Sequence, residues 1–201
     1  MAMETTTAAP PGLRERKKAA TRRALHEAAV RLTAEHGLDQ VTVEAIADAA
    51  GVSRRTFSNY FENKEDALLY GHIEWRCRLS DQFAARPDGE PAWIALRTAA
   101  REVFADFSLH PGLLRQIQLA HCNPSLSQGQ VARFAELELE LAALIAARDG
   151  LPADGIRARV LAAAFLTAVR VGAQRWADEH PGRSLIALVN EALDEVGRSF
   201  V

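Results

Sequence analysis

The sequence predicts an all-α protein of about nine helices, and three observations support this. Alanine and leucine are abundant while aromatic residues make up only 6% of the chain, a composition that favours helix. Few stretches alternate apolar and polar residues with the period of two that a half-buried strand needs. Apolar residues recur instead at helical spacing, as at Leu25, Ala28, Ala29 and Leu32.

Three segments follow from the distribution of Pro, Gly and apolar residues. Residues 1–12 are rich in Thr, Ala and Pro and are expected to form a disordered arm. Residues 13–66 are expected to form a small helical domain, and residues 67–201 a larger one. The helices predicted after Asn63 are broken at clusters of Pro and Gly. They cover 63–83, 93–107, 113–119, 130–148, 156–179 and 184–200, with a loop at 123–128.

Charge and composition limit the function. The net charge is −2, but residues 14–31 hold seven Lys or Arg against two acids, so that end could meet a polyanion. A solvated basic helix face explains the same run equally well. Residues 1–12 carry no secretory signal, and the longest apolar run, 160–169, is half a membrane span. A cytoplasmic protein with no membrane partner is expected, and Cys77 and Cys122 fit a reducing compartment.

No catalytic or metal-binding residue is predicted. The six histidines are scattered, and His121 and Cys122, as neighbours on a helix, point in different directions. The sequence holds no catalytic fingerprint. We therefore expect a protein that is not an enzyme and that needs no cofactor.

A helix-turn-helix is predicted at residues 42–61. Thr42 can cap a support helix, Gly51 suits a turn with positive φ, and Ser53 can cap the next helix. Phe57 and Phe61 lie one turn apart and should anchor that helix to the core. Its remaining faces can reach DNA, where Arg and Asn suit contacts to guanine and adenine. They present Arg54, Arg55, Thr56, Ser58 and Asn59.

The segment that follows begins with Asn63-Lys64-Glu65-Asp66, which has the pattern of a capping box and leaves Lys64 free to meet a phosphate. Together with EHG after the first helix, VTVEAIADAAGVSRRTFSNYF and NKEDALL, this makes Arg16–Leu69 similar to the DNA-binding region of the TetR family. The resemblance implies a two-fold homodimer, a second domain that binds a small ligand, and repression relieved by that ligand.

The resemblance also assigns roles to individual residues. Thr42, Tyr60 and Lys64 match positions that hold phosphates. Ser53, the cap of the second helix, is also predicted to contact DNA. Ser58 departs from the aromatic residue common at its position, which predicts the loss of one backbone or thymine contact.

The second domain resembles the mycofactocin-type regulators of this family, which implies an acyl-CoA-like effector or another hydrophobic compound. Interiors of helical bundles host such sites. An ordinary hydrophobic core explains the same apolar residues. The candidate pocket residues are Trp75, Leu79, Phe104, Phe107, Ile117, Phe134, Leu137, Phe165 and Val169.

The last two helices combine small and apolar residues, so that a pair from each subunit could pack as a four-helix interface. Without the resemblance, a hairpin within one chain explains the pattern equally well. The residues predicted at the interface are Ala164, Ala168, Gly172, Leu185, Val189, Ala192 and Val196.

The sequence thus predicts a ligand-responsive repressor that binds a palindromic operator in double-stranded DNA as a homodimer. Two alternatives remain open. One is an architectural DNA-binding dimer that needs no effector, and the other is a helical small-molecule-binding protein or enzyme whose DNA-binding end is vestigial.

Overall fold

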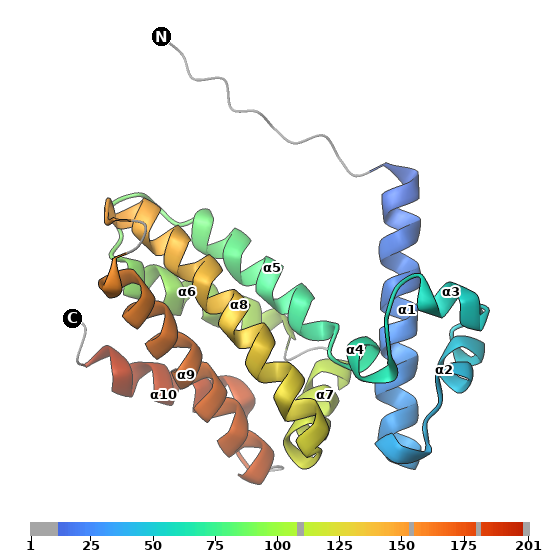
Figure 1. The fold of residues 1–201 in the computed structure, drawn as a ribbon. Coiled ribbons are helices and arrows are strands. Elements are labelled where there is room, and N and C mark those ends of the chain that lie inside the picture. Colours follow the sequence, from blue (N-terminus) through green and yellow to red (C-terminus); the bar gives the residue numbers. More distant parts are fainter. Residues whose placement is uncertain (1–11, 108–110, 153–154, 180–181, 199–201) are drawn as a thin grey trace.

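The computed structural model describes residues 12–107, 111–152, 155–179 and 182–198, and all its regular structure in these ranges is helical. Ten α-helices and one short 3-10 helix follow one another along the chain (Figure 1). Their bounds are α1 Leu13–His36, η1 Leu38–Gln40, α2 Val43–Ala49, α3 Arg54–Ser58, α4 Lys64–Leu68, α5 Gly71–Ala84, α6 Ala92–Phe107, α7 Pro111–Cys122, α8 Pro124–Asp149, α9 Ile156–Glu179 and α10 Leu185–Gly197.

Helices α1 to α4 form the part that we call the head, on one side of the molecule in Figure 1. Its core is built around Leu25 of α1, Ile46 of α2 and Phe57 of α3, which are fully buried. Ala120 of α7 and Leu126 of α8 complete this core from the other part of the chain. The head is therefore seated on α7 and α8 by apolar contact.

Helices α5 to α10 form a bundle that we call the body (Figure 1). Phe83, Leu96, Leu141 and Phe165 are almost completely buried in its core. Helix α9 packs along both α8 and α10. A helix covered on two sides needs apolar residues on more than one face, and α9 accordingly buries Leu161, Phe165 and Val169 among others.

The all-α prediction is confirmed, and two details differ. The helix expected to continue from Asn63 to Phe83 is divided into α4 and α5 at Leu69 and Tyr70. Gly71 then starts α5, and its backbone lies against the side chains of His26 and Gln116. The predicted arm falls outside the described residues except for Gly12.

The second difference concerns residues 123–128, which were expected to form a loop and instead begin α8. Pro124 occupies the first turn of that helix. Its fixed φ suits a helix start, and its missing N–H would have no partner within the helix there. The proline therefore starts a helix where composition alone indicated a break.

No helix in the ranges that the structure describes is long and apolar enough to cross a membrane.

Candidate functional site

The turn between α2 and α3 has the geometry expected of a helix-turn-helix. The Thr42 hydroxyl accepts a hydrogen bond from Ala45 N at 3.1 Å, and Ser53 Oγ accepts one from Thr56 N at 3.1 Å. Gly51 has φ +68°, a conformation that is costly for residues with a Cβ. Phe57 is fully buried, its ring centroid 5.8 Å from that of Phe61. These contacts fix the orientation of α3.

The outer face of α3 is open. Arg54, Arg55, Ser58 and the following Asn59 are exposed. Arg54 is ion-paired with Glu44 of α2 at 3.0 Å, and Ser58 Oγ donates to the carbonyl of Arg54. This face therefore presents hydrogen-bonding groups on a short, rigidly mounted helix.

Thr56, predicted on the same face, is half-buried. Its hydroxyl lies 2.9 Å from Ser53 Oγ, so the two side chains form one hydrogen-bonded cap. The structure thus gives Thr56 a supporting contact in the head besides any that it makes with DNA.

Lys64 is engaged within the chain. Its ammonium group donates to the carbonyls of Leu38 at 2.7 Å and Val41 at 2.9 Å, whereas the sequence indicated a side chain free for phosphate. An ammonium group has three donors, so one remains. Because Val41 directly precedes the cap residue Thr42, Lys64 links the start of α4 to the start of α2.

Asn63 caps α4 as predicted, its Oδ1 accepting from Asp66 N at 2.7 Å. Asp66 does not complete a capping box in the expected way. Its carboxylate pairs instead with Arg133 of α8, the Nη2–Oδ1 distance being 2.7 Å. This ion pair joins the head to the body, and no spacing in the sequence indicates it.

Arg22 is a second residue that sequence reasoning missed. Its guanidinium carbon lies 5.8 Å from the ring centroid of Tyr60, 6.0 Å from that of Phe61 and 5.6 Å from that of Tyr70. Such distances allow cation–π attraction. Arg22 belongs to the basic run of α1, so charge pointed to its segment but not to its aromatic partners. It therefore lies against the half-buried Tyr60.

Most of the predicted pocket residues lie in the core of the body. Leu79, Phe104, Phe165 and Val169 are buried there, and Ile117 is half-buried against the same core. The side chain of Phe107 lies outside the described residues. For the four buried residues, burial against their neighbours explains the apolar side chains without a ligand.

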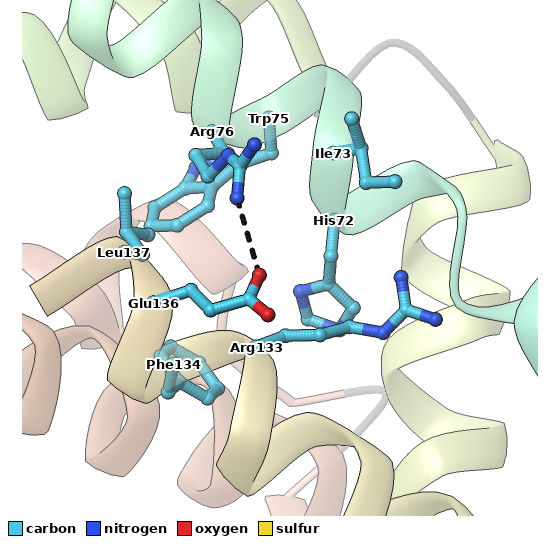
Figure 2. Close-up of a pocket in the computed structure, with 8 residues that line it drawn as sticks. All are labelled: His72, Ile73, Trp75, Arg76, Arg133, Phe134, Glu136 and Leu137. Atoms are coloured by element: carbon cyan, nitrogen blue, oxygen red, sulfur yellow. Dashed lines mark ion pairs between the residues drawn. The ribbon is translucent and has the colours of Figure 1, made fainter. Parts of the chain in front are cut away.

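The other three predicted residues, Trp75, Phe134 and Leu137, line a cavity between α5 and α8 (Figure 2). Its volume is about 60 Å³, room for a few water-sized groups. This is small for a long acyl chain. The remaining lining residues are His72, Ile73, Arg76, Arg133 and Glu136.

Four of the predicted interface residues lie in the contact between α9 and α10 of a single chain. Ala168, Leu185 and Val189 are at most 3% exposed in a single chain. A Cβ added at Gly172 would lie 2.6 Å from Val189 Cα. These four residues hold α9 against α10 within one chain, as in the hairpin alternative, and their side chains have almost no surface left for a second subunit.

The other three predicted interface residues, Ala164, Ala192 and Val196, are half-buried, and the last two pack against the core of the body. Exposed apolar surface lies elsewhere on α9. Ile156 is 80% exposed, Val160 48% and Val171 40%. At 3.6 residues per turn these three positions fall on one face of the helix.

In the described part of the chain, no three His, Cys, Asp or Glu side chains are grouped so as to hold a metal ion.

A support helix packed inward through Ile46 and Ala47, a glycine turn and an exposed second helix on an all-α scaffold define a helix-turn-helix DNA-binding protein. Residues 25–70 match the family described as bacterial regulatory proteins, tetR family, and residues 90–201 match the MftR C-terminal domain. The chain belongs to the tetR family of bacterial transcriptional regulators. The predicted family and class are therefore confirmed.

Two relatives extend the likeness over most of the chain. The HTH-type transcriptional regulator TcmR of Streptomyces glaucescens is 33% identical over 177 residues, which is 83% of this chain and 77% of TcmR. MftR of Mycobacterium tuberculosis is 25% identical over 191 residues, 90% of this chain and 92% of MftR.

Solved structures share the fold. The SmeT–triclosan complex has a TM-score of 0.65 at 21% identity, covering 90% of this chain and 91% of SmeT, the repressor of a multidrug efflux pump in Stenotrophomonas maltophilia. Thermus thermophilus FadR, a TetR family repressor in complex with lauroyl-CoA, has a TM-score of 0.56 at 26% identity, covering 90% of this chain and 95% of FadR.

Proposed function

We propose that this protein is a ligand-responsive repressor that binds a palindromic operator as a homodimer and leaves it when a small effector binds to the body. The observation that carries the proposal is the exposed face of α3, a helix whose position in the head is fixed. Arg54, Arg55, Ser58 and Asn59 are exposed, while the caps and Phe57 leave the helix itself little freedom. Arg and Asn are the side chains best suited to read guanine and adenine.

Thr42, Ser53, Tyr60 and Lys64 are proposed to position the head on the DNA backbone, with Thr56 supporting the cap. Thr42 and Ser53 lie at the N-termini of α2 and α3, where unpaired N–H groups and the helix dipole favour phosphate. Residues 13–66 and 67–201 are proposed as the DNA-binding and the effector-binding and dimerisation domains. The proposed site of action is the cytoplasm, and no catalytic step is part of the function.

The subunit interface is proposed on the outer face of α9. Ile156, Val160 and Val171 leave an apolar stripe there, and a second copy related by a two-fold axis would cover it. Ala164, half-buried on the same helix, is the predicted interface residue retained in this proposal. The dimer would place two α3 helices about one DNA turn, roughly 34 Å, apart.

The effector is proposed to be small and largely apolar. SmeT holds triclosan, and FadR, a TetR family repressor, holds lauroyl-CoA, whose acyl chain is apolar. The apolar walls of the α5–α8 cavity, Trp75, Phe134 and Leu137, favour the same kind of molecule here. The cavity volume favours a compact compound over a long acyl chain.

Footprinting with the full-length protein on the DNA upstream of its own gene tests the proposal. A protected palindrome, with half-sites about one helical turn apart, is the expected result. Protection without sequence preference, and with a steep salt dependence, would favour an architectural DNA-binding protein instead. Absence of any protein–DNA complex at low salt would favour a vestigial DNA-binding end.

A further inference from the structure

The α5–α8 cavity holds an unusual set of polar groups for an apolar site. The Trp75 side chain is only 5% exposed, and its indole N–H has no hydrogen-bond partner. A buried donor without an acceptor costs free energy. A ligand with an acceptor oxygen would remove that cost, so the cavity suits an oxygen-bearing molecule better than a pure hydrocarbon.

Two arginines line the cavity, and their partners differ. Arg76 is shared by two carboxylates, at 3.5 Å from Glu136 and 3.3 Å from Glu140. Arg133 has one carboxylate partner among the ion pairs of the described residues, Asp66 at 2.7 Å. Figure 2 shows Arg76 and Glu136 facing each other, while the Arg133 guanidinium lies on the Ile73 side. An incoming anion would therefore bind Arg133 more easily than Arg76.

Arg133 also reaches beyond the cavity. Together with Ile73 it lines a groove on the far side, whose other wall is formed by the end of the recognition segment at residues 58–62. Its partner Asp66 lies in the first turn of α4, two residues after Lys64. Lys64 in turn holds the carbonyls of Leu38 and Val41 just before α2. Arg133 thus connects the cavity wall, through α4, to the segment that precedes α2 of the helix-turn-helix.

The His72 side chain, which also lines the cavity, is uncharged at neutral pH. Burial, and next the charge of Arg133, lower the pKa of its imidazole to about 4. The neutral ring lies edge-on to Phe134, with 6.0 Å between the centroids. The His72 and Phe134 rings are therefore uncharged surfaces for a ring-bearing ligand, and the Glu136 carboxylate that also lines the cavity is paired with Arg76.

We propose that the α5–α8 cavity binds a small organic anion, of the class of single-ring carboxylic acids, whose acid group replaces Asp66 as the partner of Arg133. The acid group enters the cavity of about 60 Å³, where one of its oxygens also accepts a hydrogen bond from the Trp75 N–H, and the ring of the ligand lies over the half-buried Phe134. Loss of the Arg133–Asp66 pair then frees α4 from α8. The second step rests on the proposed function, because it gives the signal by which an effector releases the operator.

Binding to the protein alone tests the first step, with benzoate and its uncharged isostere benzamide as probes in titration calorimetry of the full chain. Benzoate is expected to bind about ten-fold more tightly than benzamide, because only the anion gains a charge-assisted bond to arginine. Asp66→Asn removes the competing carboxylate, so benzoate affinity should rise several-fold. Arg133→Met should abolish the preference for the anion.

Glu138→Gln is the matched control, because Glu138 also lies on α8 and pairs with an arginine, Arg159, at 2.9 Å. It should leave both affinities unchanged. Equal affinity for benzoate and benzamide in the natural chain would overturn the proposal. Unchanged benzoate affinity in Asp66→Asn would overturn the exchange of partners.

Operator-binding measurements distinguish the failure of this proposal from the failure of the proposed function. On the footprinted operator, benzoate and Asp66→Asn are each expected to lower affinity about five-fold or more, the lower range of allosteric coupling. If no operator is found, the repressor function fails while the calorimetric result stands. If benzoate binds with the stated preference and operator affinity does not change, the link from Arg133 to the head is wrong.

Discussion

The sequence predicts the contacts of the head better than those of the body. In the head, Thr42, Ser53 and Asn63 each cap a helix through a residue three positions ahead. In the body, Ala168 and Gly172 follow a pattern that fits both a dimer seam and an internal hairpin. Short-range hydrogen bonds identify their own partners, whereas an apolar face indicates only that something covers it. The molecule's local chemistry is therefore easier to infer than its large surfaces.

The largest expected effect tests which face of α9 is internal. Ala168→Arg places an unpaired charge where the side chain is 2% exposed, and it should lower the free energy of unfolding by about 3–5 kcal/mol. Chemical denaturation measures this. Val160→Arg, on the exposed face of the same helix, should leave the subunit folded and weaken the dimer in light scattering. A stable, monomeric Ala168→Arg protein would place Ala168 between subunits and reverse the assignment.

A smaller effect tests the head. Arg55→Ala removes an exposed group from α3 and should cost about 1–3 kcal/mol of discrimination at one base pair of the operator. Unfolding should not change, and competition binding with single-base operator variants provides the measurement.

Lys64→Ala is the contrasting variant. It should weaken binding to all DNA sequences and reduce the salt slope by about one, and it should also destabilise the head because two carbonyls lose their donor. Parallel loss of specific and non-specific binding in Arg55→Ala would show that Arg55 contacts phosphate rather than bases.

The smallest effect concerns the junction of head and body, where His26 and His72 lie. Burial lowers the pKa of both imidazoles from 6.5, that of His72 to about 4. The unfolded chain therefore binds more protons below pH 6.5, and the folded state loses stability as the pH falls from 7 to 5. The slope is at most about 1.4 kcal/mol per pH unit for each histidine.

His72→Gln should flatten this dependence in denaturation at pH 5, 6 and 7. An unaltered slope in His72→Gln would mean that the junction histidine does not titrate differently in the folded and unfolded chains.

The sequence by itself determined the helical class, the positions of the caps and the turn at Gly51, because each depends on backbone groups a few residues away. It also determined the family, since residues 25–70 carry enough of these signals in order.

Only the tertiary structure decided which apolar residues are core, which line a cavity and which face of α9 stays exposed. It alone paired Asp66 with Arg133 across 67 residues of sequence and brought Arg22 to Tyr60. Burial and long-range ion pairs depend on which helix faces meet, and residue spacing along one helix does not encode the identity of its neighbour.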